Sequence, residues 1–365
     1  MISLGGVMGL AVVRELHERR VPASPDEVAA FETDAFSGFV LARASAGLSD
    51  STIRNDTGHL EQMRSWFGRP LWEMQPPDAD RYFGVVLRGA AKGTRLAKAQ
   101  SLSTYFAFLD LRLRAEIYAL MGRALQCPLD EINRPRGRAD IGLRIPPGDD
   151  EVGALFDGWR GDLVSCRKFA PTARSYVAAR LIALIGLRVN EVRMLDVADL
   201  RWELGRFGKL HVRFGKGSQG SGPRERVTPL INGADRLLRW YIEDVWACFG
   251  DDYTRPGAPL FPSERHHPDG TAMRISCDGL RRGLAEAVAG HLPDWTDRLT
   301  PHALRHYCAS QLYRSGMDLI AIQELLGHWW IATTMRYVHV LKTHVEDSWI
   351  AGQQRAAERW EGLLS

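Results

Sequence analysis

The stretch TPHALRHYCASQLYRSGMDLIAIQELLGHWWIATTMRYVHV, residues 300–340, holds the most informative pattern of the chain. Its first part predicts a helix that ends at Gly316, and DLIAIQELLGH predicts a second helix that ends at Gly327, because glycine commonly terminates helices. His302 and Arg305 lie three positions apart in the first helix, so their side chains share one face and can address one ligand together. A fixed cation beside a group that titrates near neutrality suits a reaction that develops negative charge and moves a proton.

Further reactive groups follow in the same stretch. His306 comes directly after the arginine, His328 follows the second helix, and Tyr337 lies nine positions later (337 − 328 = 9). Taken one at a time, such side chains are more often structural than catalytic. The prediction of a site therefore depends on the ordered combination.

Upstream of this stretch the sequence offers a second arginine and a lysine. Arg188 follows the apolar run LIALIGL, Glu191 lies three positions on, and Lys216 sits in a glycine-rich turn. Two guanidinium groups match the charge and geometry of a phosphate transition state, and a tyrosine phenolate can both attack and leave. No Asp/Glu cluster with metal-ligand spacing accompanies them, so we expect the cations to neutralise charge without a metal or other cofactor.

Composition indicates a soluble globular protein of two domains. The chain has 365 residues and a net charge of +3, and no apolar run reaches the roughly 18–20 residues that span a bilayer. Its first 20 residues lack a basic region and a cleavage site, so they do not read as a signal peptide. Five scattered cysteines without a CxxC pair favour a reducing cytoplasm over disulfides or a cysteine-based zinc site.

A basic segment runs from Arg81 to Arg114. It contains seven lysines and arginines and one acid, a balance of 7 − 1 = +6, which fits either a DNA-binding surface or a solvated helix face. The candidate DNA-binding residues are Arg88, Lys92, Arg95 and Lys98. Aromatic residues between 105 and 109 recur at helical spacing and are expected in the core rather than stacked on bases.

Element patterns predict a mainly α-helical protein with a small antiparallel β-hairpin. Residues 27–133 are expected to form an all-helical domain with Ser24 as its first N-cap, and 134–148 an extended, positively charged linker. Residues 149–344 would form the second domain. Its hairpin pairs KLHVRF (209–214) with RERVTPL (224–230), and the run that precedes Arg188 is apolar enough to be a buried helix.

The order Arg-x-x-Glu, hairpin lysine, His-x-x-Arg-His, Leu-Gly-His and a tyrosine nine residues later resembles the catalytic domain of the tyrosine recombinase (phage integrase) family. The resemblance covers roughly 145–345, and the helical segment 27–133 is similar, by pattern only, to that family's core-binding domain. It implies a two-domain DNA clamp that cuts and rejoins DNA site-specifically. Tyr337 would attack the scissile phosphate, giving a 3′-phosphotyrosine and a free 5′-hydroxyl, while Arg188 and Arg305 hold the non-bridging oxygens.

The resemblance also implies roles for the remaining groups. His302 would act as acid and base on the tyrosine, His328 would hydrogen-bond the phosphate, and Lys216 would protonate the leaving 5′-oxygen. Glu191 and His306 would orient these side chains. A partner strand would then reverse the reaction through a Holliday junction without ATP or metal. The implied partners are double-stranded DNA with a specific site, further copies of the chain in a tetramer, and accessory proteins.

Three features leave alternatives open. The family's hairpin turn is shorter than GKGSQGSGPRER, so Lys209 is an alternative proton donor to Lys216, and Arg224 could supply charge only. Few residues precede the first helix, which favours a two-domain recombinase without an added N-terminal domain. The tail 345–365 is expected to form a helix, packed on its own domain or donated to a neighbouring subunit.

Other classes of function are weaker. A type IB topoisomerase uses a similar residue set, and a DNA-binding regulator would keep the fold with an inactive site, although every expected catalytic position is filled here. A metal-dependent nuclease would need His266, His267 and Asp269, but HHPDGT reads better as a polar loop with an Asp-Gly turn. The chain is expected in the cytoplasm of a bacterium, encoded by its chromosome or by a mobile element.

Overall fold

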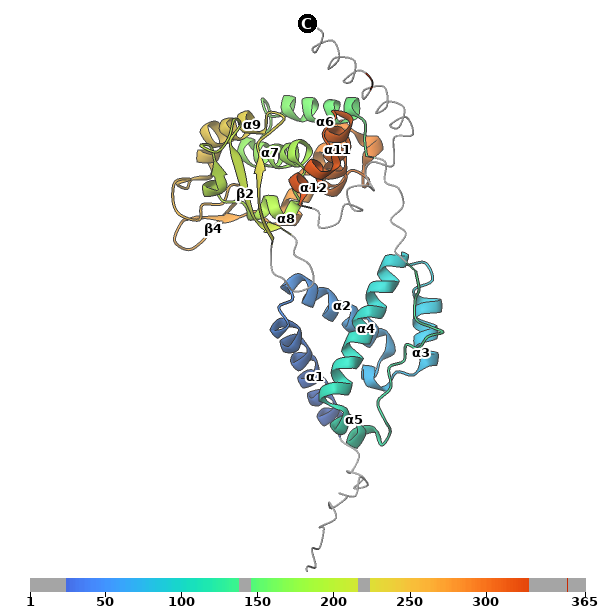
Figure 1. Ribbon diagram of the computed structural model, residues 1–365. Helices are drawn as coiled ribbons and strands as arrows, with labels where there is room; N and C mark the ends of the chain where they lie inside the picture. The colour runs from blue at the N-terminus through green and yellow to red at the C-terminus, as the bar shows by residue number, and fades with distance from the viewer. Residues whose placement is uncertain (1–23, 138–145, 216–223, 328–352, 354–365) are drawn as a thin grey trace, which may run out of the picture. The chain divides into compact units, whose positions relative to one another are not determined.

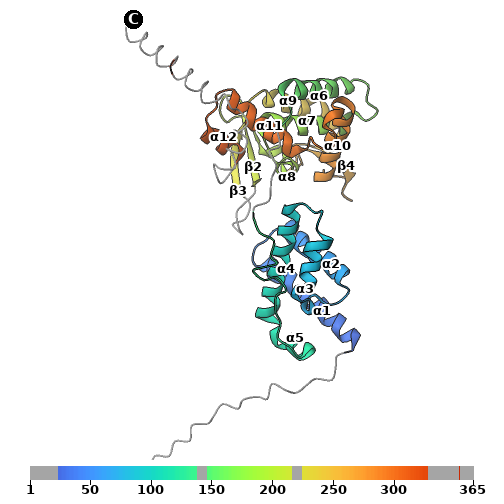
Figure 2. The same ribbon diagram turned by 90° about the vertical axis from the view of Figure 1, so that its right-hand side faces the viewer.

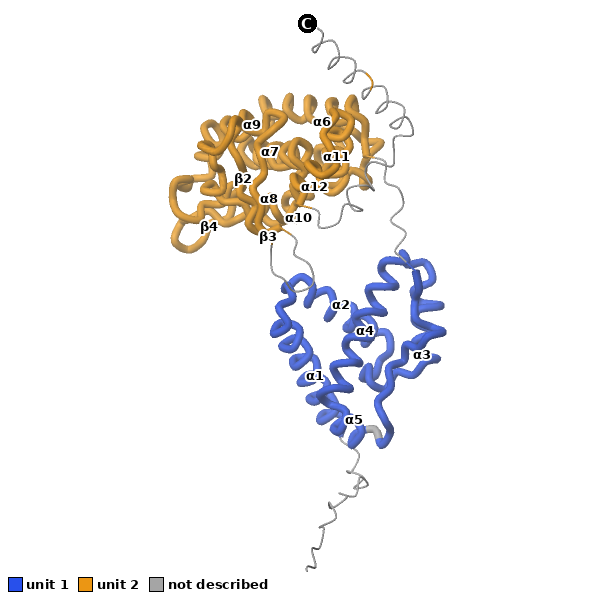
Figure 3. Tube along the Cα trace, viewed as in Figure 1, with its two compact units in different colours: residues 1–142 blue, residues 143–365 orange. Residues whose placement is uncertain are grey.

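The computed structural model describes residues 24–137, 146–215, 224–327 and 353 (Figure 1). The chain divides into two compact units, 1–142 and 143–365 (Figure 3). Their boundary lies inside the stretch 134–148 that the sequence predicts as a linker. Within the described ranges, no helix combines the length and apolarity needed to cross a membrane.

The regular secondary structure of the first unit, in its described part, is all helical, and residues 122–137 are irregular. Its elements are α1 (Pro25–Ser45), α2 (Asp50–Phe67), η1 (Leu71–Glu73), α3 (Pro76–Arg81), η2 (Tyr82–Val86), α4 (Lys92–Arg112) and α5 (Arg114–Met121). Ser24 is the N-cap of α1, as predicted, and forms a capping box with Glu27. Helix α4 ends at Arg112 and α5 begins at Arg114, with a break at Leu113. This break turns α5 so that Ile117 is buried in the same core as α4.

Aromatic side chains form the core of this unit, which confirms their interpretation as core residues. Tyr105, Phe106 and Leu109 on α4 are buried, and the ring of Tyr105 stacks on that of Phe36 from α1 with centroids 5.0 Å apart. Offset aromatic contacts of this kind add to the hydrophobic stabilisation of a small helical unit.

Lys98 does not belong to the basic surface, so its selection as a DNA-binding residue is wrong. Its side chain is only 6% exposed. The ammonium donates to Gln62 Oε1 at 2.6 Å and to the Tyr82 hydroxyl at 2.9 Å. A buried lysine needs such partners to offset its lost hydration, and here they tie α4 to α2 and η2. Arg88 and Lys92 are exposed, and Arg95 is half-buried.

The second unit surrounds one buried helix. Its helices are α6 (Asp149–Asp162), α7 (Phe169–Ile185), α8 (Val189–Met194), α9 (Ala234–Trp240), α10 (Cys277–His291), α11 (Pro301–Arg314) and α12 (Leu319–Leu326), with short turns at η3 (Val197–Asp199), η4 (Tyr241–Val245), η5 (Trp246–Phe249) and η6 (Pro293–Trp295). The apolar α7 packs against α6, α9, α10 and α11 (Figures 1 and 2). This confirms the expected buried helix, and the glycine ends of α11 and α12 also agree with the sequence.

Two small antiparallel sheets complete this unit and confirm the predicted fold class. The first has the order β1 (Leu200–Arg201), β2 (Lys209–Gly215) and β3 (Arg224–Pro229). Strands β2 and β3 form the expected hairpin, with Leu210 opposite Thr228 and Val212 opposite Arg226. The second sheet pairs β4 (Pro262–His266) with β5 (Ala272–Arg274), where the sequence suggests only a loop. These strands are too short to show a clear period-2 pattern.

Candidate active site

The C-terminal ends of α7 and α12 lie close together at the candidate site. The apolar α7 ends at Ile185, and Gly186 takes a left-handed conformation (φ +70°) that turns the chain towards α8. A Cβ atom at this position would lie 2.2 Å from Cδ2 of Leu326, the last residue of α12. The ends of α7 and α12 can therefore meet only because residue 186 has no side chain.

Glu191 lies at the centre of three guanidinium groups. Its side chain is 1% exposed and accepts hydrogen bonds from Arg188 Nη1 at 2.7 Å, Arg226 Nη1 at 3.0 Å and Arg226 Nη2 at 2.8 Å. Arg305 Nη1 lies 3.9 Å from the same carboxylate, and the Arg188 backbone N–H donates to Oε2 at 2.8 Å. Burial alone opposes ionisation, but the Arg226 hydrogen bonds and the charges of all three arginines lower the pKa of Glu191 to about 2.

The same three arginines hold the end of α12. Three consecutive backbone carbonyls, at 325–327, each accept a hydrogen bond from a different one. Arg226 Nε donates to the first at 3.1 Å, Arg305 Nη2 to the second at 2.7 Å and Arg188 Nη2 to the third at 3.4 Å. The last carbonyls of a helix lack partners within it and carry the negative end of its dipole, so cations stabilise them.

Helix α11 supplies two of the three histidines of the predicted site, His302 and His306. Thr300 caps its N-terminus by accepting the Ala303 N–H. Arg305 is buried and also donates to the Gly186 carbonyl, whereas His302 is exposed and His306 half-buried. The rings of the two histidines meet edge to face with centroids 4.4 Å apart.

The structure thus brings Arg188, Glu191 and Arg305 together, as the sequence order suggests. The other predicted residues, Lys216, His328 and Tyr337, lie outside the described residues. The described chain stops directly before the first two: β2 ends at Gly215, and α12 is followed by Gly327 in the arginine cluster.

The alternative cations at the hairpin lie beside this cluster. Lys209, half-buried, and Arg224, exposed, line a cavity of about 740 Å³ together with Arg226 and Gly327. Lys209 pairs with Pro229 at the base of the hairpin, whereas Arg224 pairs with Gly215 at the end of the strands next to residues 216–223.

Sequence reasoning missed Arg226. Alternation along β3 contains the signal: Arg226 lies two positions before the fully buried Thr228, so both side chains point to the inner face of the hairpin. An arginine at an inward position of a strand needs a buried partner, and Glu191 provides it.

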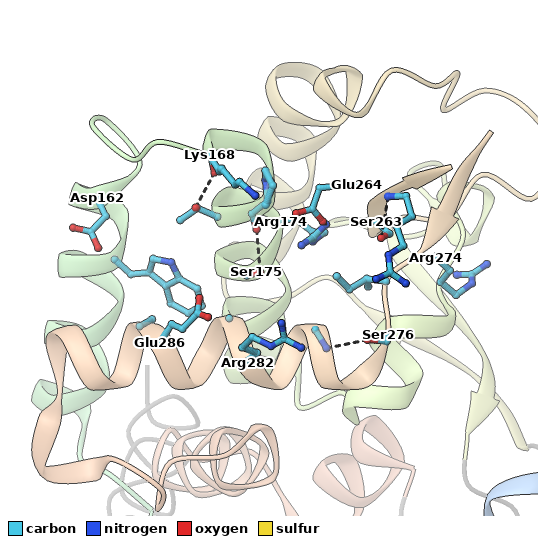
Figure 4. A pocket seen from close by; sticks show the side chains of 18 of the residues that line it. Asp162, Lys168, Arg174, Ser175, Ser263, Glu264, Arg274, Ser276, Arg282 and Glu286 are labelled. Carbon is cyan, nitrogen blue, oxygen red and sulfur yellow. Dashed lines mark hydrogen bonds and ion pairs between the residues drawn. The ribbon is translucent and has the colours of Figure 1, made fainter. Parts of the chain in front are cut away.

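A separate cavity of about 790 Å³ lies beside α7 and α10 and contains none of the predicted catalytic residues. Figure 4 shows Lys168 at the start of α7 and Arg282 on α10 on its opposite sides. Arg174, buried at its back, donates to the Pro262 carbonyl at 2.8 Å and to Glu264 at 3.0 Å.

The residues considered for a metal-dependent nuclease serve the β4–β5 hairpin. His266 Nε2 lies 2.9 Å from the Phe249 carbonyl, and Asp269 accepts the Thr271 N–H at 2.9 Å, which confirms the Asp-Gly turn. Among the described residues, no group of three or more His, Cys, Asp or Glu side chains could hold a metal ion.

Comparisons with known proteins agree on one family. The phage integrase family profile matches residues 163–344. Tyrosine recombinase XerC of Vibrio campbellii is 31% identical over 88% of this chain and 92% of its own length, and XerD of Oceanobacillus iheyensis is 29% identical over 87% and 97%.

Solved structures show the same fold. The XerH site-specific recombinase, bound to a palindromic difH substrate after cleavage, aligns with a TM-score of 0.60 over 94% of this chain and 99% of its own, at 17% identity. The Tn1549 transposon integrase in complex with transposon right-end DNA aligns with a TM-score of 0.59 over 89% and 99%, at 18% identity. From its sequence relatives and its fold, this chain belongs to the phage integrase family of tyrosine recombinases.

Proposed function

We propose that this protein is a site-specific DNA recombinase that cuts and rejoins strands through a 3′-phosphotyrosine on Tyr337. The observation that carries the proposal is the convergence of Arg188 and Arg305 on Glu191 at the end of α12. A phosphate in transfer develops negative charge on its non-bridging oxygens, and preorganised guanidinium groups stabilise such charge without moving during the reaction. The solved relatives are recombinases and integrases bound to DNA, which favours strand exchange over topoisomerase activity or an inactive regulator.

Each predicted side chain then has one task. Arg188 and Arg305 bind the two non-bridging oxygens, and Glu191, backed by its own hydrogen bonds, fixes their geometry. His302 takes the proton of the attacking tyrosine, with His306 holding the ring. Bond formation between the tyrosine oxygen and phosphorus breaks the bond to the 5′-oxygen, and that oxygen leaves as a hydroxyl.

The remaining two groups act on the leaving side of the phosphate. Lys216 donates the proton that the 5′-oxygen needs, and His328 hydrogen-bonds the phosphate. Both positions directly follow described residues of the arginine cluster or its hairpin, Gly327 and Gly215, which supports placing them at the same phosphate. Attack by the 5′-hydroxyl of a partner strand reverses every step, so bond energy is kept and no ATP is consumed.

The helical unit gives the enzyme its hold on DNA in this proposal. Residues 27–133 form the core-binding domain, and 149–344 the catalytic domain. Arg88, Lys92 and Arg95 contact backbone phosphates, whereas Lys98 does not. Four copies assemble on two recombination sites in the bacterial cytoplasm, with the tail 345–365 donated to a neighbouring copy.

Covalent trapping tests the proposal. A nicked duplex carrying the site that the wild-type protein selects from random-sequence DNA is incubated with protein in EDTA, and the adduct is resolved on a denaturing gel. Wild type should form an adduct, and Tyr337→Phe should bind the duplex but form none. An adduct with Tyr337→Phe would show that another residue is the nucleophile, and no adduct with wild type would refute the mechanism.

A further inference from the structure

Arg226 has contacts that exceed those of an ordinary surface ion pair. Its side chain is only 11% exposed and gives both terminal nitrogens to Glu191, at 3.0 and 2.8 Å. Its third nitrogen, Nε, donates to the Leu325 carbonyl at 3.1 Å. A fork-shaped group with three bonds to two fixed acceptors has little freedom left, so it defines the positions of whatever it joins.

The two acceptors belong to different parts of the site. Glu191 lies on α8 and orients Arg188, while the Leu325 carbonyl lies in the last turn of α12, three residues before position 328. Arg226 itself is on β3, opposite Val212 of β2, and β2 continues to Gly215 directly before position 216. One guanidinium therefore connects the carboxylate, the hairpin and the helix end.

Packing makes this connection rigid. A Cβ atom at residue 327 would lie 3.0 Å from both Cδ and Nη1 of Arg226, so the arginine runs directly along the backbone of Gly327. That backbone has φ +66°, a conformation that glycine adopts without strain. Arg226 thus packs against the backbone at the end of α12, where a side chain at residue 327 would crowd it.

We propose that Arg226 is a positioning residue of the recombinase site, which holds Glu191 and joins the hairpin that carries Lys216 to the helix end that precedes His328. This inference rests on the proposed function, because it concerns the alignment of those groups on a phosphate. Arg226 touches neither DNA nor tyrosine in this role. It acts by fixing Arg188 through Glu191, together with the strand end at Gly215 and the helix end at Gly327.

Lysine should not replace Arg226 fully. An ammonium group can neutralise Glu191, but it cannot give two parallel hydrogen bonds to the carboxylate and a third to a carbonyl. The expected order of cleavage rates is therefore wild type, then Arg226→Lys, then Arg226→Ala. Because a misplacement of about 1 Å costs on the order of 100-fold in rate, Arg226→Ala should lose about 10- to 100-fold.

The experiment separates rate from binding. Single-turnover adduct formation is measured on the nicked duplex at saturating protein, and the Kd for the same duplex is measured in parallel. Arg226→Ala should slow adduct formation as stated and change Kd by less than about threefold, because its role is alignment rather than binding. If its rate at saturation stays within about threefold of wild type, the proposal is wrong.

Arg213→Ala is the matched control. Arg213 lies on β2 of the same hairpin and makes its own forked ion pair, Nε and Nη2 to Asp199 at 2.7 and 2.8 Å, rather than to Glu191. Its loss should leave the cleavage rate near wild type at temperatures where the variant is folded. Equal rate losses for the two alanine variants, with equal drops in Tm, would assign the effect to hairpin stability and overturn the proposal.

Glu191→Gln shows whether Arg226 acts through the carboxylate. If it does, the double variant Arg226→Ala/Glu191→Gln should cleave no more slowly than the slower single variant, because each change already removes the same Arg226–Glu191 interaction. If the rate loss of the double variant equals the product of the two single losses, Arg226 does not act through Glu191. A wild-type protein that forms no adduct would instead refute the proposed function itself, which distinguishes the two failures.

Discussion

The charge of Glu191 should be a measurable part of the protein's stability. Its pKa falls from the 4.5 of an exposed carboxyl to about 2 in the folded protein. One pKa unit corresponds to about 1.4 kcal/mol, so the folded state gains about 3 kcal/mol from this group at neutral pH. Because the folded pKa is the lower one, this stability is fully present above about pH 5 and is lost as the pH falls towards 2.

Glu191→Gln removes the titration while keeping the shape of the side chain. The variant should be less stable than wild type by about 2–3 kcal/mol at pH 7. The amide nitrogen of glutamine is a donor, so it cannot accept the hydrogen bonds that the arginines give to the carboxylate. The gap should narrow by about 1 kcal/mol between pH 7 and pH 4, because only wild type loses the contribution.

Urea unfolding of the full chain, followed by tryptophan fluorescence at several pH values, measures this gap. The control variant is Glu225→Gln, at an exposed position on β3. Its free energy of unfolding should differ little from that of wild type. A wild-type to Glu191→Gln difference below about 0.5 kcal/mol at pH 7, or one that grows on acidification, would refute the reasoning.

Two further outcomes are expected. Gly186→Ala should lower the free energy of unfolding by about 2–4 kcal/mol, because the new methyl group would overlap Leu326 and alanine is strained in the left-handed conformation. Gly68→Ala has the same backbone strain, at φ +76°, but open space around it, so it should cost only about 1 kcal/mol. Thermal unfolding of the two variants measures the difference. Lys98→Met should destabilise the protein by about 1–3 kcal/mol in the same assay and leave the salt dependence of DNA binding unchanged. Arg88→Ala should instead reduce the slope of the logarithm of the DNA-binding constant against the logarithm of the salt concentration by roughly 0.9.

Much of the site could be predicted from the sequence because its signals are local. The glycines that end α11 and α12, the three-residue spacing of His302 and Arg305, and the Arg188–Glu191 pair at the start of α8 are all set within one or two turns of helix. Local geometry determines such contacts, so spacing along the chain is enough to find them.

The errors concern side chains whose environment comes from other elements. Lys98 looks like part of a basic helix face, and only the packing of α4 against α2 and η2 shows that its ammonium is buried. In the sequence, Arg226 looks like one more charge of a polar strand, because its partner Glu191 lies 35 residues away. Charge counts along a chain do not show which cations are committed to internal partners.

The arginine cluster also indicates how the site can receive a phosphate. Three guanidiniums and one carboxylate carry a summed charge of 3 − 1 = +2, and the guanidiniums also bond to the carbonyl dipoles at the end of α12. On the proposed function, these cations interact more strongly with the dianionic transition state than with the singly charged phosphodiester. Arg188 is the most exposed of the three at 27%, and its contact with the Gly327 carbonyl, at 3.4 Å, is the longest of the three carbonyl contacts. Exchanging this weak contact for a charged phosphate oxygen costs little and gains a charge-assisted hydrogen bond, whereas the contacts of Arg226 remain in place.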